Sequence, residues 1–171
     1  MATDLKRYAI TVMREPMEVY SYWRALENLP QFSPYLKSVQ QLDDRRSRWT
    51  TEGPQGDISW EAEITEDVPG ERLSWRSVES ADVKNFGTVE FKRAPGNRGC
   101  EVYAEMQADI PAGKLGEMIA GMTGNKPEQQ MAETMHRFKT LLECGEIPII
   151  DGQPSDQMRG ESETKKRATV R

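Results

Sequence analysis

The strongest periodic signal in the sequence is an amphipathic pattern over Pro127–Cys144. At about 100° per residue, its large apolar side chains fall within one narrow arc of a helix: Met131, Met135, Phe138 and Leu142. Pro127 suits a first helical turn, where its missing N–H group costs nothing, and Gly145 suits a left-handed stop after the last turn. Such a helix is about 27 Å long, and its apolar stripe needs a surface of similar length to cover it.

Strands are the segments that can supply this surface. Ile58–Val68 alternates apolar residues with polar ones, which is typical of an antiparallel strand that buries one face. Residues 101–110 show the longest alternation in the chain. Five more segments have a strand pattern, and polar turns join most of them: residues 7–13, 38–42, 48–52, 72–78 and 86–94.

A second helix is predicted near the start of the chain. Apolar side chains recur at helical spacing over residues 17–28, with Trp23 as the largest group to be buried. Pro30 and Pro34 interrupt the next segment, so residues 31–35 form a turn or a short helix. The order is therefore a strand, a helix, six strands and a long helix. That order implies an α+β fold with an antiparallel sheet.

The periodic segments all lie within residues 1–148, which we expect to form one domain. Residues 111–124 have helical spacing but contain several glycines, which indicates a soft helix before the long one. Residues 149–171 are polar, lack periodicity and end in a basic stretch. We expect a disordered tail there.

Composition narrows the function classes. The net charge of −5 argues against a nucleic-acid-binding surface, because phosphate binders usually carry a basic patch. Cys100 and Cys144 have neither metal-ligand spacing nor a disulfide framework, so we expect free thiols, no metal and no cofactor. No apolar run approaches the length of about 18 residues that spans a membrane, and the first residues lack the apolar core of a signal peptide. These observations predict a cytoplasmic protein.

Four segments together resemble the START-like (SRPBCC) superfamily, in particular the bacterial polyketide cyclase/dehydrase branch with its coenzyme Q-binding START domain-like members. They are ITVMREPMEVYSYWRALENLPQFSPYLKSV, WEAEITEDVPGERLSWRS, GTVEFKRAPGNRGCEV and PEQQMAETMHRFKTLLECGEIP. The order and spacing of many weak motifs carry the resemblance over most of residues 5–148. It implies a helix-grip fold, in which a curved antiparallel sheet wraps a long C-terminal helix and leaves an apolar cavity. It also implies a small hydrophobic ligand, such as a lipid, a quinone or a polyketide.

Strand parity identifies the side chains that would face this cavity. No carboxylate, histidine or lysine occurs at the inward positions, so we predict no catalytic residue. A bulge that shifts the parity of a strand would admit Arg76, Glu90 or Tyr103. His136, the only histidine, lies about 120° from the apolar stripe of its helix and is expected to be solvated.

The predicted ligand contacts come from four strands and the two C-terminal segments. They are Trp60, Ile64, Trp75, Phe91, Tyr103, Met106, Met118, Met122, Met131, Met135 and Phe138. Methionine is flexible and polarisable, which suits a wall that must fit varied apolar molecules. A filled core would have the same composition, so the sequence leaves both interpretations open.

These alternatives lead to three candidate functions. The first is non-catalytic binding of a small hydrophobic ligand, with residues 79–85 and 111–124 as a movable gate. The second is a cyclase or dehydratase, which needs a polar pair inside the cavity. The third is a protein-interaction domain with a filled core that acts through Trp23, Phe32 and Tyr35 at its surface. The sequence does not select an oligomeric state.

Overall fold

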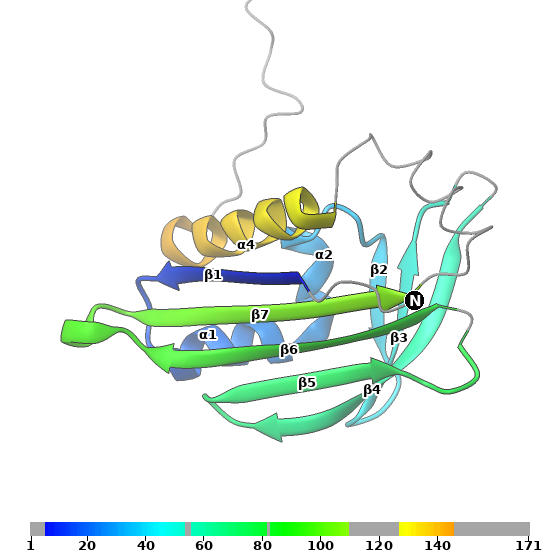
Figure 1. The fold of residues 1–171 in the computed structure, drawn as a ribbon, viewed down its shortest axis with the longest axis horizontal. Helices are drawn as coiled ribbons and strands as arrows, with labels where there is room; N and C mark the ends of the chain where they lie inside the picture. Colours follow the sequence, from blue (N-terminus) through cyan, green and yellow to red (C-terminus); the bar gives the residue numbers. More distant parts are fainter. Residues whose placement is uncertain (1–5, 54–55, 82, 110–126, 146–171) are drawn as a thin grey trace, which may run out of the picture.

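Seven strands form one antiparallel sheet in the computed structural model, which describes residues 6–53, 56–81, 83–109 and 127–145 (Figure 1). From β2 to β7, consecutive strands are neighbours, and β1 lies beside β7. The strands are β1 (Lys6–Val12), β2 (Ser38–Gln41), β3 (Arg46–Thr51), β4 (Ile58–Val68), β5 (Arg72–Ser77), β6 (Lys84–Arg93) and β7 (Cys100–Asp109).

All seven predicted strands are confirmed, and β4 has the predicted bounds. β3 begins at Arg46 and β6 begins at Lys84, so both start earlier than their apolar patterns indicate. β6 therefore takes up the end of the predicted loop over residues 79–85. The predicted soft helix over residues 111–124 and the predicted tail over residues 149–171 lie outside the described residues.

The first helix is shorter than predicted. α1 spans Pro16–Arg24, and the chain leaves the helical conformation at Ala25, which has a ψ of 78°. A 3-10 turn (Leu26–Asn28) and the short helix α2 (Leu29–Phe32) come next. On an unbroken helix Phe32 would lie about 180° from Trp23. The break turns Phe32 back to the core, where both side chains are buried.

The C-terminal helix α4 spans Pro127–Cys144, as predicted. It ends at Gly145, whose φ of +75° and N–H bond to the Leu141 carbonyl (2.8 Å) form a left-handed cap. Near its end, a Glu143 carboxylate oxygen accepts a hydrogen bond from the Met13 backbone N–H (2.8 Å), which ties α4 to the end of β1. Among the described helices, none is long and apolar enough to cross a membrane.

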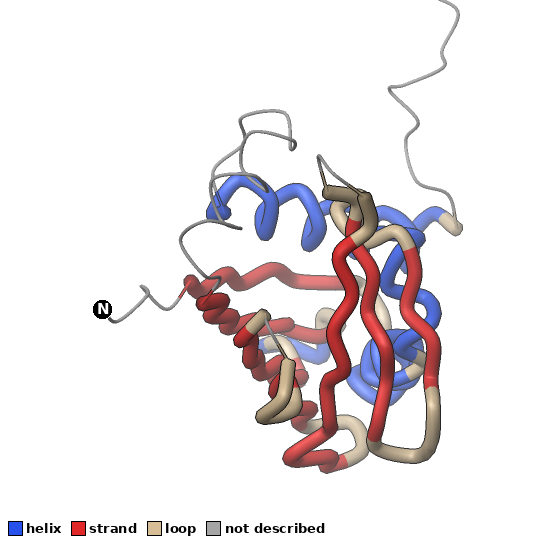
Figure 2. Tube along the Cα trace, turned by 90° about the vertical axis from the view of Figure 1, so that its right-hand side faces the viewer, coloured by secondary structure: helices blue, strands red, loops and turns tan. Residues whose placement is uncertain are grey.

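The sheet is curved, and its strands run in different directions at its two ends (Figure 2). α1 and α2 lie behind the sheet in Figure 1, and α4 runs along β1 and packs on α2. The helices meet in a cluster of aromatic rings. The Phe138 ring centroid lies 5.0 Å from that of Trp23 and 4.8 Å from that of Phe32. This is the helix-grip arrangement, and its core lies between the inner face of the sheet and the helices.

The outer face of the sheet is polar. Cross-strand ion pairs lie along it, such as Arg48–Glu61 (3.0 Å), Arg76–Glu63 (2.9 Å) and Arg7–Glu105 (2.7 Å). The arginine side chains of these pairs are about half exposed or more. The predicted alternation of buried and solvated residues is therefore confirmed along these strands.

Candidate functional site

Three tryptophan side chains gather on the inner face of β3, β4 and β5. The ring centroids of Trp49 and Trp75 are 6.0 Å apart, and their planes are nearly parallel at 24°. The Trp49 and Trp60 centroids are 6.2 Å apart with an angle of 32° between the planes. All three side chains are buried. We call these three residues the tryptophan cluster.

Small residues make room for this cluster. Ala62 stands between Trp60 and Ile64 on β4 and is paired with Ser47 on β3 and Ser77 on β5. Its short side chain leaves space above β4 for a contact between rings on β3 and β5. On β6, Gly87 is paired with Trp75, and a Cβ atom at Gly87 would overlap the Trp75 ring. The Trp75 ring therefore packs directly on the backbone of β6.

The three indole N–H groups differ in their partners. Trp49 Nε1 donates a hydrogen bond to Ser47 Oγ (2.8 Å). Trp60 Nε1 and Trp75 Nε1 are buried without a hydrogen-bond partner in the part of the chain that the structure describes. Buried donors are nearly always paired in native proteins, so two unpaired donors in one cluster need an explanation.

Sequence reasoning missed Trp49. Its signal was present, because the buried Ser47, Trp49 and Thr51 alternate with exposed or half-buried residues along β3. The strand is short and half polar, and its parity is clear only from its register with β4, where Trp49 lies opposite Trp60. The pairing of β3 with β4 is therefore what assigns Trp49 to the cluster.

Most of the other predicted contact residues also lie on the inner side. Ile64 and Met135 are buried, and Met106 and Met131 are partly buried against the core. Phe91 is buried beneath α1, with its ring edge-to-face against Tyr20 at 5.8 Å. Phe138 belongs to the aromatic cluster at the helices. The rings of Phe91 and Phe138 thus pack against α1 and α2, whereas Trp60 and Trp75 pack with Trp49. Met118 and Met122 lie outside the described residues.

Tyr103 was expected among the ligand contacts, but the structure places it on the outer face. β7 keeps a regular register with β6 throughout, so the residue between the buried Val102 and Ala104 faces outward. The Tyr103 hydroxyl donates a hydrogen bond to Glu101 (2.8 Å), and the Lys92 ammonium lies 5.1 Å from the ring centroid. The hydrogen bond to Glu101 also raises the pKa of Tyr103.

A bulge does admit a carboxylate to the inner side, at a different residue from those predicted. The register of β4 with β5 shifts between Ile64 and Glu66, which turns Asp67 toward α1. Asp67 accepts hydrogen bonds from the Tyr20 hydroxyl and from Arg24 Nε (2.8 Å). The prediction that the inward positions hold no carboxylate is therefore wrong at this end of the sheet.

The pKa values of this group are explained by its contacts. Burial, followed by the hydrogen bond to Asp67, raises the pKa of Tyr20 to about 12. Burial alone would raise the pKa of Asp67, but the hydrogen bonds from Tyr20 and Arg24 outweigh it and lower that pKa. At neutral pH the group is a protonated phenol, a carboxylate and a guanidinium. It joins α1 to β4.

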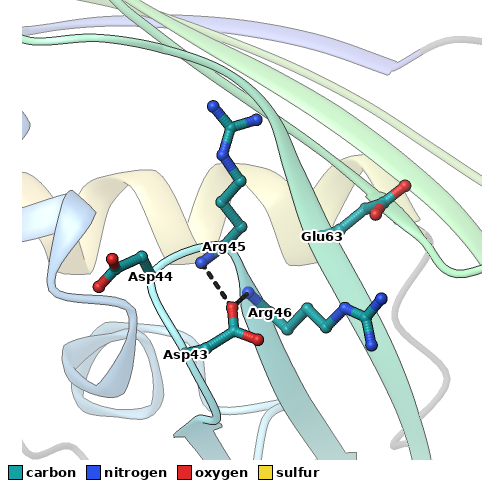
Figure 3. A pocket seen from close by; sticks show the side chains of 5 residues that line it. All are labelled: Asp43, Asp44, Arg45, Arg46 and Glu63. Atoms are coloured by element: carbon teal, nitrogen blue, oxygen red, sulfur yellow. Dashed lines mark hydrogen bonds between the residues drawn. The ribbon is translucent and has the colours of Figure 1, made fainter.

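A hollow at the hairpin between β2 and β3 is lined by charged side chains (Figure 3). They are Asp43, Asp44, Arg45, Arg46 and Glu63. Asp43 accepts hydrogen bonds from the backbone N–H groups of Arg45 and Arg46 (2.8 Å each), and these bonds lower its pKa. The interpretation of the Asp43–Asp44 pair as turn residues is confirmed for Asp43. This polar hollow does not suit an apolar ligand.

The surface patch predicted for an interaction domain is not at the surface. Trp23 and Phe32 are buried, and Tyr35 is half-buried with its hydroxyl donating to Glu133 (2.6 Å). His136 is exposed, as predicted, and its Nε2 lies 2.8 Å from the Tyr8 hydroxyl oxygen. Within the described ranges, no cluster of three or more histidine, cysteine or acidic residues could hold a metal ion.

The sequence matches a family model with known relatives. The model of the "Polyketide cyclase / dehydrase and lipid transport" family matches residues 12–136. The chain belongs to this family. An uncharacterised 17.2 kDa protein of Streptomyces lincolnensis is 27% identical over 124 residues, which cover 72% of this chain and 79% of that protein.

Solved structures share the fold of this chain. DR_A0006 from Deinococcus radiodurans is 39% identical and has a TM-score of 0.70, with 84% of this chain and 99% of that chain covered. TTHA0849 from Thermus thermophilus shares the fold at 20% identity and a TM-score of 0.57, covering 79% and 97% of the two chains. The di-domain ARO/CYC StfQ from the steffimycin biosynthetic pathway also shares it at 19% identity and a TM-score of 0.55, covering 81% of this chain and 44% of StfQ.

Proposed function

We propose that this family member binds a small hydrophobic ligand on the inner face of its sheet, against Trp49, Trp60 and Trp75, without catalysis. The observation that carries the proposal is the tryptophan cluster itself. Its rings contact one another, whereas the rings of Phe91 and Phe138 are engaged with the helices. A broad aromatic surface on rigid strands suits a flat or branched apolar molecule.

The absence of catalysis is part of the proposal. At the inward positions of β3 to β5 next to the cluster, the described side chains are apolar or carry only a hydroxyl group, as in Ser47, Thr51 and Ser77. A serine or threonine hydroxyl needs an adjacent base before it can act in proton transfer or as a nucleophile. Such a surface favours binding over chemistry. The cavity in front of the cluster belongs to the same proposal, with Met106, Met131 and Met135 as further contacts.

A cyclase or dehydratase is the second candidate, and one observation bears on it. Tyr20 and Asp67 form a polar pair between α1 and the end of β4, where Asp67 is exposed, whereas an enzyme of this kind requires a polar pair inside the cavity. Asp67 is also bound by Arg24, and the pKa of Tyr20 is raised to about 12. A phenol with such a pKa is a weak acid at neutral pH. The pair therefore suits a structural clamp better than proton transfer.

Binding can be tested with N-phenyl-1-naphthylamine, a neutral probe that fluoresces in apolar surroundings. We expect saturable binding, with energy transfer from tryptophan to the probe because the cluster lies at the site. Trp75→Ala and Trp60→Ala should each weaken binding about tenfold or more, since each removes a large contact surface. Far-UV circular dichroism would establish that each variant is folded.

Tyr103→Ala is the matched control, because it removes an aromatic ring from the opposite face of the same sheet. Its affinity for the probe should equal that of the wild type. Native mass spectrometry of the purified protein, before and after solvent extraction, would then identify any molecule that it carries from the cell. A folded protein that shows no saturable uptake of the probe would refute the proposed function.

A further inference from the structure

Three buried polar atoms of residues on the inner face of β4, β5 and β6 have no hydrogen-bond partner within the described ranges. They are Trp60 Nε1, Trp75 Nε1 and the amide oxygen of Asn85. The two indole groups are donors, and the amide oxygen is an acceptor. The Trp60 and Trp75 side chains are 8% and 4% exposed, so water does not replace the missing partners at the surface.

The register of the sheet brings these groups to one region. Ser77 lies two residues after Trp75 on β5, so both side chains face inward. On one side Ser77 is paired with Ala62, which lies two residues after Trp60 on β4. On the other side Ser77 Oγ accepts a hydrogen bond from the Asn85 backbone N–H (3.0 Å). Asn85 precedes the inward-facing Gly87 by two residues, so it shares the same face.

The indole N–H groups of Trp49 and Trp23 have different surroundings from those of Trp60 and Trp75. Trp49 lies in the same cluster, yet its N–H group is paired with Ser47. Trp23 also lacks a partner among the described residues, but it lies in the helix cluster, with the Phe138 ring at 83° to its own plane. A neighbouring ring face provides a weak acceptor for an indole N–H group. The Trp60 and Trp75 rings are instead stacked or tilted on Trp49, which presents no ring face at such an angle.

We propose that these three groups select the ligand. They fit a neutral apolar molecule that carries a carbonyl-type oxygen for the indole donors and a hydroxyl or N–H group for the Asn85 oxygen. A charged group would be costly there, because the buried polar side chains of the described residues are all serine or threonine, and none of them carries a charge that could pair with it. This inference rests on the proposed function and adds the polar pattern of the ligand. A plain hydrocarbon would leave all three groups unpaired.

Three naphthalene probes of similar shape separate these interactions. They are 2-acetyl-6-hydroxynaphthalene, its 6-methoxy ether and 2-isopropyl-6-methylnaphthalene. The first carries both polar groups, the second lacks the donor, and the third lacks both. Each dissociation constant is measured by displacement of N-phenyl-1-naphthylamine. The probes differ in hydrophobicity, so their dissociation constants are not compared with one another directly. For each probe, the dissociation constant of each protein variant is divided by that of the wild type, and these ratios are compared.

Trp60→Phe and Trp75→Phe remove a donor while keeping an aromatic ring. Each should weaken binding of the two ketones by about two- to tenfold more than binding of the hydrocarbon, which is the range for one hydrogen bond. Asn85→Leu should weaken binding of the hydroxyketone by a similar factor more than it weakens binding of the methyl ether. Trp23→Phe is the control, because it removes an unpaired indole N–H group away from the site and should leave these ratios unchanged.

The outcomes distinguish this inference from the proposed function. If the variants change the affinity of all three probes by the same factor, the polar groups do not select the ligand, and binding at the cluster still stands. If no probe displaces N-phenyl-1-naphthylamine from the wild type, or if that dye itself does not bind, the proposed function fails and the inference fails with it. Selective losses in the Trp60, Trp75 and Asn85 variants would support both.

Discussion

Gly87 determines where the Trp75 ring can lie. The ring covers the backbone of β6 at the position opposite Trp75, where any side chain would overlap it. Ala62 has a similar role on β4, because a larger side chain there would separate the rings of Trp49 and Trp75. Two small residues thus define the shape of a surface made of large ones. This is a general property of close-packed interiors, where each volume depends on its neighbours.

Gly87→Ala should therefore displace Trp75 and destabilise the fold by about 1–3 kcal/mol, which is the usual cost of overpacking. Urea denaturation measures the loss, and near-UV circular dichroism reports the altered ring environment. The double variant Gly87→Ala/Trp75→Leu serves as the control. If the clash is the cause, its loss should be smaller than the sum of the two single losses. Unchanged stability and spectra in Gly87→Ala would contradict this account of the ring position.

At the scale of the elements, hydrogen bonds among Tyr20, Arg24 and Asp67 help to hold α1 on the sheet. Tyr20 and Arg24 lie one helical turn apart on α1 and both bind Asp67 at the far end of β4. The bulge in β4 is what turns Asp67 toward the helix. Arg24 also donates a hydrogen bond to the Asp44 carbonyl (2.8 Å), which extends the contact to the β2–β3 hairpin. This polar contact adds to the apolar packing of α1, in which Tyr20 contacts Phe91 and Trp23 contacts Phe138.

Tyr20→Phe should cost about 1–2 kcal/mol near neutral pH, because it removes a hydrogen bond to a carboxylate. The difference between wild type and variant should shrink at both extremes of pH. Above about pH 10 the unfolded chain loses the Tyr20 proton, whereas the folded protein keeps it until the raised pKa of about 12, so wild-type stability falls over that interval. Asp67 has a lowered pKa, so its contribution is present above about pH 4 and is lost as pH falls through the folded value.

Denaturant titrations of both proteins across this range provide the measurement. Thr11→Ala, an exposed substitution on β1, is the control. The difference in its free energy of unfolding from that of the wild type should be the same at every pH. A Tyr20→Phe difference that stays constant from neutral pH to about pH 12 would show that the phenol does not titrate as this clamp requires.

At the scale of the whole molecule, the two faces of the sheet contribute very differently to stability. The inner face meets the aromatic cluster of Trp23, Phe32 and Phe138, in which Phe32 and Phe138 are fully buried. The outer face carries ion pairs in water, where desolvation is small and the attraction is screened. Substitutions on the inner face should therefore lower the free energy of unfolding strongly, whereas substitutions on the outer face should change it little.

Phe138→Ala should cost about 3–5 kcal/mol, since it leaves a cavity where α4 meets α1 and α2. Arg76→Ala breaks the pair with Glu63, but its side chain is 65% exposed, so the change should stay within about 1 kcal/mol. Chemical denaturation of both variants under identical conditions gives the comparison. Comparable losses in the two proteins would refute the division between the faces.

The sequence by itself determined the elements whose signals are local. α4 has its predicted bounds because the apolar stripe, the initial proline and the final glycine all act within the helix. β4 has its predicted bounds because alternation places Trp60 and Ile64 on one face without reference to any partner. The order of these elements was enough to predict an α+β fold with an antiparallel sheet, and the family resemblance implied that this sheet wraps the long helix.

The tertiary structure decided the features that depend on pairing between distant segments. The bulge beside Ile64 reverses the parity of β4, and only its register with β5 reveals that Asp67 faces inward. Trp49 joins the cluster because β3 lies opposite β4, and Tyr103 leaves the predicted set because β7 stays regular. The unpaired indole N–H groups are visible only once every neighbour is in place. Periodicity reports which face a side chain occupies, whereas hydrogen bonding depends on atoms that distant residues bring within about 3 Å.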